Sequence, residues 1–122
     1  MNTFDLEKYY KEAHSGENVN NDGILEYIKS FEHVILWGGS YLGVAIGKYL
    51  LENGVHIDKY WDMRCKELGN VNGITVDMPF TAEDKENTVV IFCIGNNVIR
   101  GGLLKNLREN GFAHVIRGDY LY

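Results

Sequence analysis

A glycine-rich turn, Gly38-Gly39-Ser40-Tyr41-Leu42-Gly43, holds the residues best suited to chemistry. It follows an apolar run and opens a helical pattern, and the backbone amides at such a helix start bind phosphate groups. The spacing matches the dinucleotide-binding pattern G-x-G-x-x-G, except that Ser40 replaces the middle glycine. Gly38 permits a tight turn, Gly43 permits close packing, and the Ser40 hydroxyl can cap the helix or bind a phosphate oxygen. We therefore predict that the turn binds the phosphate-bearing part of a nucleotide or nucleotide-sugar; the alternative is that the glycines only let strand and helix pack.

Three further groups of residues are expected to face the same site. Asp62 falls at the end of an expected strand, roughly 20 residues past the glycines, where a carboxylate reaches ribose hydroxyls. Gly95-Asn96-Asn97 ends the most apolar strand and opens the next helix, and Arg100 follows one turn later as a donor to a diphosphate. The plainer interpretations are a solvated aspartate, helix capping by Asn96 and a surface arginine.

Catalytic and metal-binding patterns are not found in the rest of the sequence. The histidines are scattered without the paired spacing that predicts a metal site: His14, His33, His56 and His114. No serine or cysteine stands in a nucleophile elbow, and no acid pair is placed for general acid-base work. Cys65 and Cys93 are expected to be thiols. The sequence favours a binding module that has neither a catalytic centre of its own nor a metal.

Five strands that alternate with helices are expected to position the candidate site. Apolar runs predict strands at 34–37, 55–61, 73–76, 88–94 and 114–117, and helical spacing predicts helices at 40–53 and 98–110. Residues 62–72 are expected to be irregular, and residues 81–84 to open a short helical turn. The expected fold is a Rossmann-like three-layer α/β sandwich with a five-stranded parallel sheet of order 3-2-1-4-5, which brings the turns after Trp37 and Ile94 to one crevice.

The N-terminal residues 1–32 are expected to be a helical extension of a core at 33–117. Apolar residues recur at helical spacing in Leu6-Tyr9-Tyr10-Ala13 and again in Ile24-Tyr27-Ile28-Phe31. The first of these helices has no obvious groove on the core. Its apolar face and the aromatic end Tyr120-Leu121-Tyr122 therefore predict a homo-oligomer or a contact with another subunit of the same pathway. The alternative is that this helix folds back across its own sheet.

Composition limits the classes of partner. The 122 residues, of which 45% are hydrophobic, suffice for one domain with one core. With 17 acidic and 12 basic side chains the formal net charge is -5, which predicts no binding to nucleic acid. No apolar run is long enough to cross a bilayer, and the first residues lack a basic segment followed by an apolar one. We expect a cytoplasmic protein that does not bind membranes.

With these landmarks, the stretch from His33 to about Arg117 resembles the Rossmann-like nucleotide-binding domain of bacterial sugar O- and N-acyltransferases of the PglD type. The matching segments are the turn at 36–43, Trp61-Asp62, the edge strand Gly73-Ile74-Thr75-Val76 and the turn at 93–100. The resemblance implies a nucleotide-sugar ligand, with a UDP-sugar favoured, and a place in surface-sugar or polysaccharide biosynthesis. The family transfers its acyl group in a following β-helix of hexapeptide repeats. No such repeats occur here, so acyl transfer by this chain alone is not expected.

Two other functions are compatible with the same residues. An enzyme subunit that binds NAD(H) would use the same turn and Asp62, although no substrate-handling region follows in the sequence. An assembly protein would keep the fold without the ligand, and the N-terminal helices and the aromatic end favour it. Fold analogy does not separate these functions from nucleotide binding.

Overall fold

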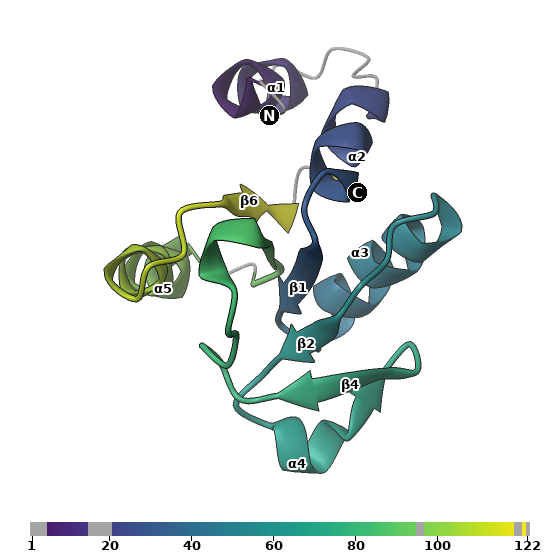
Figure 1. Ribbon diagram of the computed structural model, residues 1–122, viewed down its shortest axis with the longest axis vertical. Helices are drawn as coiled ribbons and strands as arrows, with labels where there is room; N and C mark the ends of the chain where they lie inside the picture. Colours follow the sequence, from purple (N-terminus) through teal and green to yellow (C-terminus); the bar gives the residue numbers. More distant parts are fainter. Residues whose placement is uncertain (1–4, 15–20, 95–96, 119–120, 122) are drawn as a thin grey trace.

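The protein is a mixed α/β structure built on a six-stranded, mostly parallel sheet (Figure 1). The computed structural model describes residues 5–14, 21–94, 97–118 and 121, with the backbone alone at 12–14 and 97–100. The strand order is β3-β4-β2-β1-β5-β6, and only the pair of β3 and β4 is antiparallel. The strands are β1 (His33–Trp37), β2 (Lys59–Trp61), β3 (Asn70–Val71), β4 (Ile74–Asp77), β5 (Thr88–Phe92) and β6 (Val115–Arg117).

The central strands β1 and β5 have the most apolar sequences. They pair in parallel over five residues, from His33 opposite Thr88 to Trp37 opposite Phe92. Helices cover both faces of this part of the sheet, which is why these strands are continuous apolar runs and do not alternate. The first and fourth strands expected from the sequence are therefore neighbours, as predicted.

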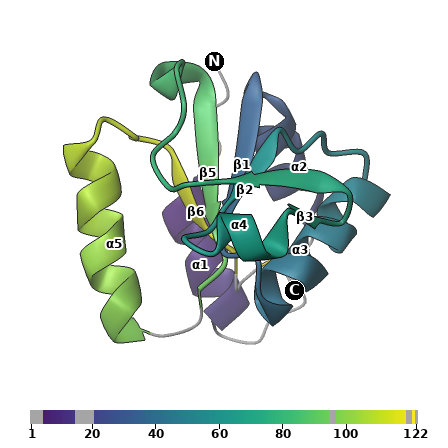
Figure 2. The same cartoon turned by 90° about the horizontal axis from the view of Figure 1, so that it is seen from below.

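Helices cover the two faces of the sheet unequally (Figure 2). One face carries α1, α2 and α3, whose apolar side chains pack with Val34, Leu36 and the rest of one core cluster. The opposite face carries α5, which packs on Ile35 and Trp37. Throughout the described ranges, every helix falls short of the length and apolar character that a bilayer crossing needs. The helices are α1 (Leu6–His14), α2 (Asp22–Lys29), α3 (Tyr41–Glu52), α4 (Cys65–Leu68) and α5 (Asn97–Glu109).

The segment after β2 is more regular than predicted. Residues 62–72, expected to be irregular, contain α4 and the strand β3, which forms a hairpin with β4. Asn72 and Gly73 make the two-residue turn of this hairpin, with positive φ angles of 54° and 78°. An Asn-Gly pair favours this turn because both residues tolerate positive φ, so the sixth strand was detectable in the sequence.

The largest other differences from the prediction concern the start of β2 and the loop before β5. The strand expected at 55–61 begins only at Lys59, although Val55 and Ile57 are buried. The short helical turn expected to open at 81–84 begins later, as a 3-10 helix at Lys85–Asn87. Phe80, at the start of this loop, has a φ of 70° and packs against Trp37. The loop therefore covers part of the apolar cluster on the α5 face of the sheet.

The N-terminal helix α1 packs on its own domain. Tyr9 is buried, and its hydroxyl donates to Asn21 Oδ1 at 3.0 Å, while Asn21 Nδ2 donates to the Tyr49 hydroxyl at 3.0 Å. The Tyr10 hydroxyl accepts the backbone N–H of Arg117 in the edge strand β6 at 2.9 Å. The prediction that α1 has no groove is therefore wrong, because its tyrosine hydroxyls supply the hydrogen bonds that join it to the core. Packing of α1 on its own sheet was the alternative. The expected oligomer stays a prediction that now rests on the aromatic end, of which Tyr120 and Tyr122 lie outside the described residues.

Candidate functional site

The glycine turn lies where β1 ends and α3 begins, at the carboxyl end of the parallel strands. Gly38 has a φ of 118° and donates its N–H to the carbonyl of Trp61 at 2.8 Å. A Cβ atom on Gly43 would lie 1.7 Å from the carbonyl oxygen of Gly38, so α3 can approach β1 this closely only with glycine at that position. Close packing thus accounts for Gly43, as the plainer interpretation of the turn expected.

Asp62 lies directly against this turn and is almost completely buried. Its Oδ2 accepts the N–H of Gly39 at 2.9 Å and Nη2 of Arg64 at 2.9 Å, and its Oδ1 accepts the backbone N–H of Arg64 at 2.8 Å and Nε at 3.0 Å. The hydrogen bonds from Arg64, with those from the two backbone amides, lower the pKa of Asp62 from 3.8 to about 2. A carboxylate has about four lone-pair sites, and here the protein fills them all.

Arg64 links Asp62 to Ser40. It was not among the site residues predicted from the sequence. Its Nη2 also donates to Ser40 Oγ at 2.6 Å, and about half of its side chain is exposed (47%). The Ser40 hydroxyl therefore contacts arginine, and among the described residues it caps no amide of α3. The signal in the sequence was the short spacing Asp62-Met63-Arg64, which places a carboxylate and a guanidinium together just before α4.

Two exposed apolar side chains border this end of the sheet. Tyr41, the first residue of α3, is 88% exposed, and Met63, next to Arg64, is 77% exposed. A shallow hollow of about 330 Å³ extends from Tyr41 along the outer side of α3 to Glu52. An exposed aromatic ring beside a helix start is available to stack on a planar ligand.

The second predicted turn is only partly described. Gly95 and Asn96 lie outside the described residues, and Asn97 and Arg100 are described only as backbone in the first turn of α5. The structure therefore brings together the predicted residues Gly38, Gly39, Ser40 and Asp62, and it places Tyr41, Leu42 and Gly43 in the adjoining turn of α3. The predicted contacts of Asn97 and Arg100 fall outside the described side chains.

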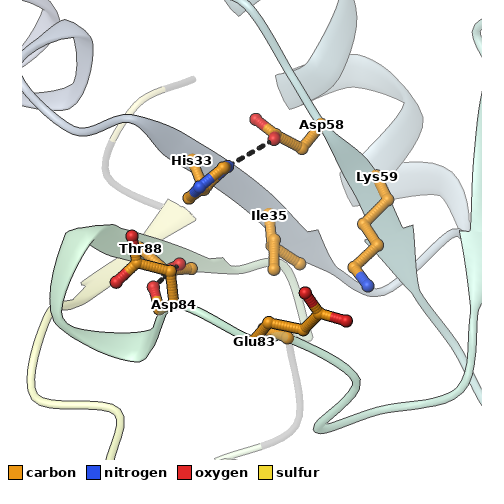
Figure 3. A pocket seen from close by; sticks show the side chains of 8 residues that line it. His33, Ile35, Asp58, Lys59, Glu83, Asp84 and Thr88 are labelled. Carbon is orange, nitrogen blue, oxygen red and sulfur yellow. Dashed lines mark hydrogen bonds and ion pairs between the residues drawn. The ribbon is translucent and has the colours of Figure 1, made fainter.

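A pocket of about 350 Å³ lies at the other, amino end of the strands (Figure 3). His33 opens β1, and its Nδ1 lies 2.8 Å from Asp58 Oδ2, a hydrogen bond that raises the pKa of His33. Asp58 Oδ1 accepts the N–H of Val34 at 3.0 Å, which fixes the carboxylate beside β1. The pocket is lined by His33, Ile35, Asp58, Lys59, Ala82, Glu83, Asp84 and Thr88.

Three groups that can ligate a metal meet at this pocket. Glu32, His33 and Asp84 each offer one ligand atom, and within the described residues these atoms lie no more than 4.8 Å from one another. His33 was expected to stand alone because the histidines have no paired spacing in the sequence. Its partners are instead the adjacent Glu32 and Asp84, which lies in the loop before β5. Asp84 is too far from His33 in the sequence for a spacing rule to link the two residues.

Comparison with known proteins identifies no relative: no family model, curated protein or solved structure matches the chain. The resemblance to the nucleotide-binding domain of sugar acyltransferases stays a prediction from the quoted residues.

Proposed function

We propose that the protein is a Rossmann-like binding domain for a nucleotide or nucleotide-sugar, with the phosphate groups at the glycine turn. The observation that carries the proposal is the Arg64 guanidinium, half-exposed and 2.6 Å from Ser40 Oγ at the start of α3. Guanidinium groups bind phosphate through paired N–H donors, and the amides and dipole at a helix start favour the same anion. The nucleotide-sugar class and the link to surface-sugar biosynthesis come from the family resemblance.

Binding in this proposal exchanges the partners of Arg64. In the structure the guanidinium neutralises Asp62, whose carboxylate also accepts the N–H of Gly39. A phosphate beside Ser40 attracts the same guanidinium away from Asp62, and this frees lone pairs of the carboxylate for a ribose or sugar hydroxyl. The exposed ring of Tyr41 then lies next to the site for stacking on the base.

A ligand panel tests binding itself. UDP-, CDP-, GDP- and dTDP-sugars, NAD(H) and coenzyme A are added separately, and thermal unfolding of the full chain is followed. A ligand at a hundred times its dissociation constant adds about 2.7 kcal/mol to the free energy of unfolding. If none of these compounds raises the unfolding temperature, nucleotide binding is wrong for this chain.

An arginine substitution tests the position of the phosphate. Arg64→Ala removes charge-assisted hydrogen bonds and is expected to weaken binding of a responding nucleotide by about tenfold or more. Arg108→Ala, which removes an exposed arginine in the last turn of α5, is the matched control and should leave affinity unchanged. Equal affinities for both variants would place the phosphate elsewhere.

A further inference from the structure

We propose that Glu32, His33 and Asp84 form a binding site for a divalent transition-metal ion of the zinc type, at the amino end of the sheet. The site lies at the opposite end of the strands from the glycine turn and does not depend on the proposed nucleotide binding. Its donors are one imidazole nitrogen and two carboxylates, a set that suits zinc and its neighbours in the first transition row.

The three ligands come from segments that the fold brings together. Glu32 and His33 lie at the start of β1, while Asp84 belongs to the loop that leads into β5, the strand paired with β1. Their ligand atoms lie within 4.8 Å of one another. Ligands about 2.1 Å from a tetrahedral zinc ion are about 3.4 Å apart. To bind one ion, the side chains must therefore move together by distances on the order of 1 Å. Glu32 is exposed and Asp84 is partly exposed, so both side chains can move this far.

Asp58 holds one nitrogen of the His33 imidazole and leaves the other for a ligand. Because its Oδ2 is bonded to His33 Nδ1 at 2.8 Å, Nε2 is the nitrogen left for a metal ion. Figure 3 shows the His33 ring between the Asp58 and Asp84 side chains. Metal-bound histidines usually donate their second nitrogen to a carboxylate in this way, which fixes the ring and makes it a better ligand.

The surroundings of the ring favour a cation and leave room for a fourth ligand. Around His33 stand the carboxylates of Glu32, Asp58 and Asp84, while the cation of the pocket, Lys59, lies 3.4 Å from Asp77. Asn87 Nδ2 donates to both carboxylate oxygens of Asp84, at 3.1 and 3.0 Å, and so orients that ligand. With three protein ligands, the remaining position of the ion opens on the pocket of about 350 Å³, to water or to an anionic ligand.

Metal binding is measured on the full chain with Zn²⁺ alone, in competition with a chromophoric chelator. We expect one equivalent of Zn²⁺ per chain and a four-coordinate visible spectrum when Co²⁺ replaces it. His33→Ala and Asp84→Asn should abolish this binding. Asp58→Asn, which does not remove a ligand, should weaken it by about 10- to 100-fold.

A second histidine provides the matched control. His56 is largely exposed and its Nε2 lies 3.7 Å from Asp58 Oδ1, so it is the alternative ligand at this end of the sheet. His56→Ala should bind Zn²⁺ as the parent chain does, and circular dichroism verifies that each variant is folded. The proposal is overturned if the parent chain binds no Zn²⁺, if folded His33→Ala binds it equally well, or if His56→Ala abolishes binding.

Discussion

The two ends of the parallel strands use their charged residues in different ways. At the carboxyl end, each carboxylate oxygen of Asp62 accepts two hydrogen bonds, and the turn around Gly43 is packed without spare space. At the amino end, the carboxylates of Glu32, Asp58 and Asp84 surround one imidazole beside an open pocket. Both ends belong to the same parallel strands, so the difference between them arises from their side chains and from the loops that join the strands. The carboxyl end engages its carboxylate in hydrogen bonds within the protein and leaves the Arg64 cation half-exposed, whereas the amino end gathers carboxylates around an imidazole.

The largest expected effect is the loss of close packing at the carboxyl end. Gly43→Ala places a Cβ 1.7 Å from the carbonyl oxygen of Gly38, so α3 must move away from β1. We expect a decrease of about 3 kcal/mol or more in the free energy of unfolding, measured by urea denaturation. Gly101→Ala is the control: it meets no atom within 4 Å in α5 and should stabilise by about 0.5–1 kcal/mol. A Gly43→Ala variant as stable as the parent would show that the turn is loosely packed.

The next effect concerns the charge of Asp62. Its folded pKa of about 2 lies below the ordinary 3.8, so the ionised carboxylate stabilises the fold at all pH values above about 4. As the pH falls from about 4 to 2, the unfolded chain takes up the proton first, and about 2 kcal/mol of stability is lost. Asp62→Asn should remove this part of the acid dependence and lower stability at pH 7. An unchanged pH profile in that variant would mean that other carboxylates cause the acid sensitivity.

A smaller effect is expected where α1 closes the edge of the sheet. Tyr10→Phe removes the acceptor of the Arg117 backbone N–H in β6. We expect a loss of about 1 kcal/mol of stability, because the partly buried amide loses its hydrogen bond. Hydrogen exchange of the Arg117 amide should speed up while central amides such as that of Ile91 keep their protection. Equal exchange at Arg117 in both proteins would place α1 away from this edge.

The sequence predicted the elements whose pattern is both long and uninterrupted. The runs that became β1 and β5 lack polar residues in their interiors, and the helix that begins at Tyr41 has apolar residues at regular spacing. The β3 and β4 hairpin was missed because its first strand has only two residues, too few for a periodic signal, although Asn72-Gly73 marked the turn. Local pattern therefore predicted the centre of the sheet, β4 and the edge strand β6, and it missed the two-residue edge strand β3.

The contacts that define the two candidate sites, at the two ends of the parallel strands, could not be predicted from residue spacing in the sequence. The strand-end position of Asp62 was predicted, but three of its four internal hydrogen bonds come from Arg64, which lies just before α4, and the fourth comes from Gly39. Asp84 reaches His33 only because β5 pairs with β1 and the preceding loop ends there. Histidine spacing alone therefore gave no sign of the amino-end cluster.

The smallest expected change in stability is at the amino end of the strands. Loss of a carboxylate there should not destabilise the fold, whereas loss of the Asp62 carboxylate at the other end should. Glu32→Gln removes one exposed carboxylate from a group that already contains Asp58 and Asp84. Without metal, like charges there repel each other, so the change should leave stability within about 0.5 kcal/mol of the parent or raise it slightly. Urea denaturation with a chelator at low and high salt measures this, because salt screens the repulsion and should erase any gain. A loss of stability comparable to that of Asp62→Asn would mean that the amino-end carboxylates also hold the fold together, and the contrast between the two ends would be lost.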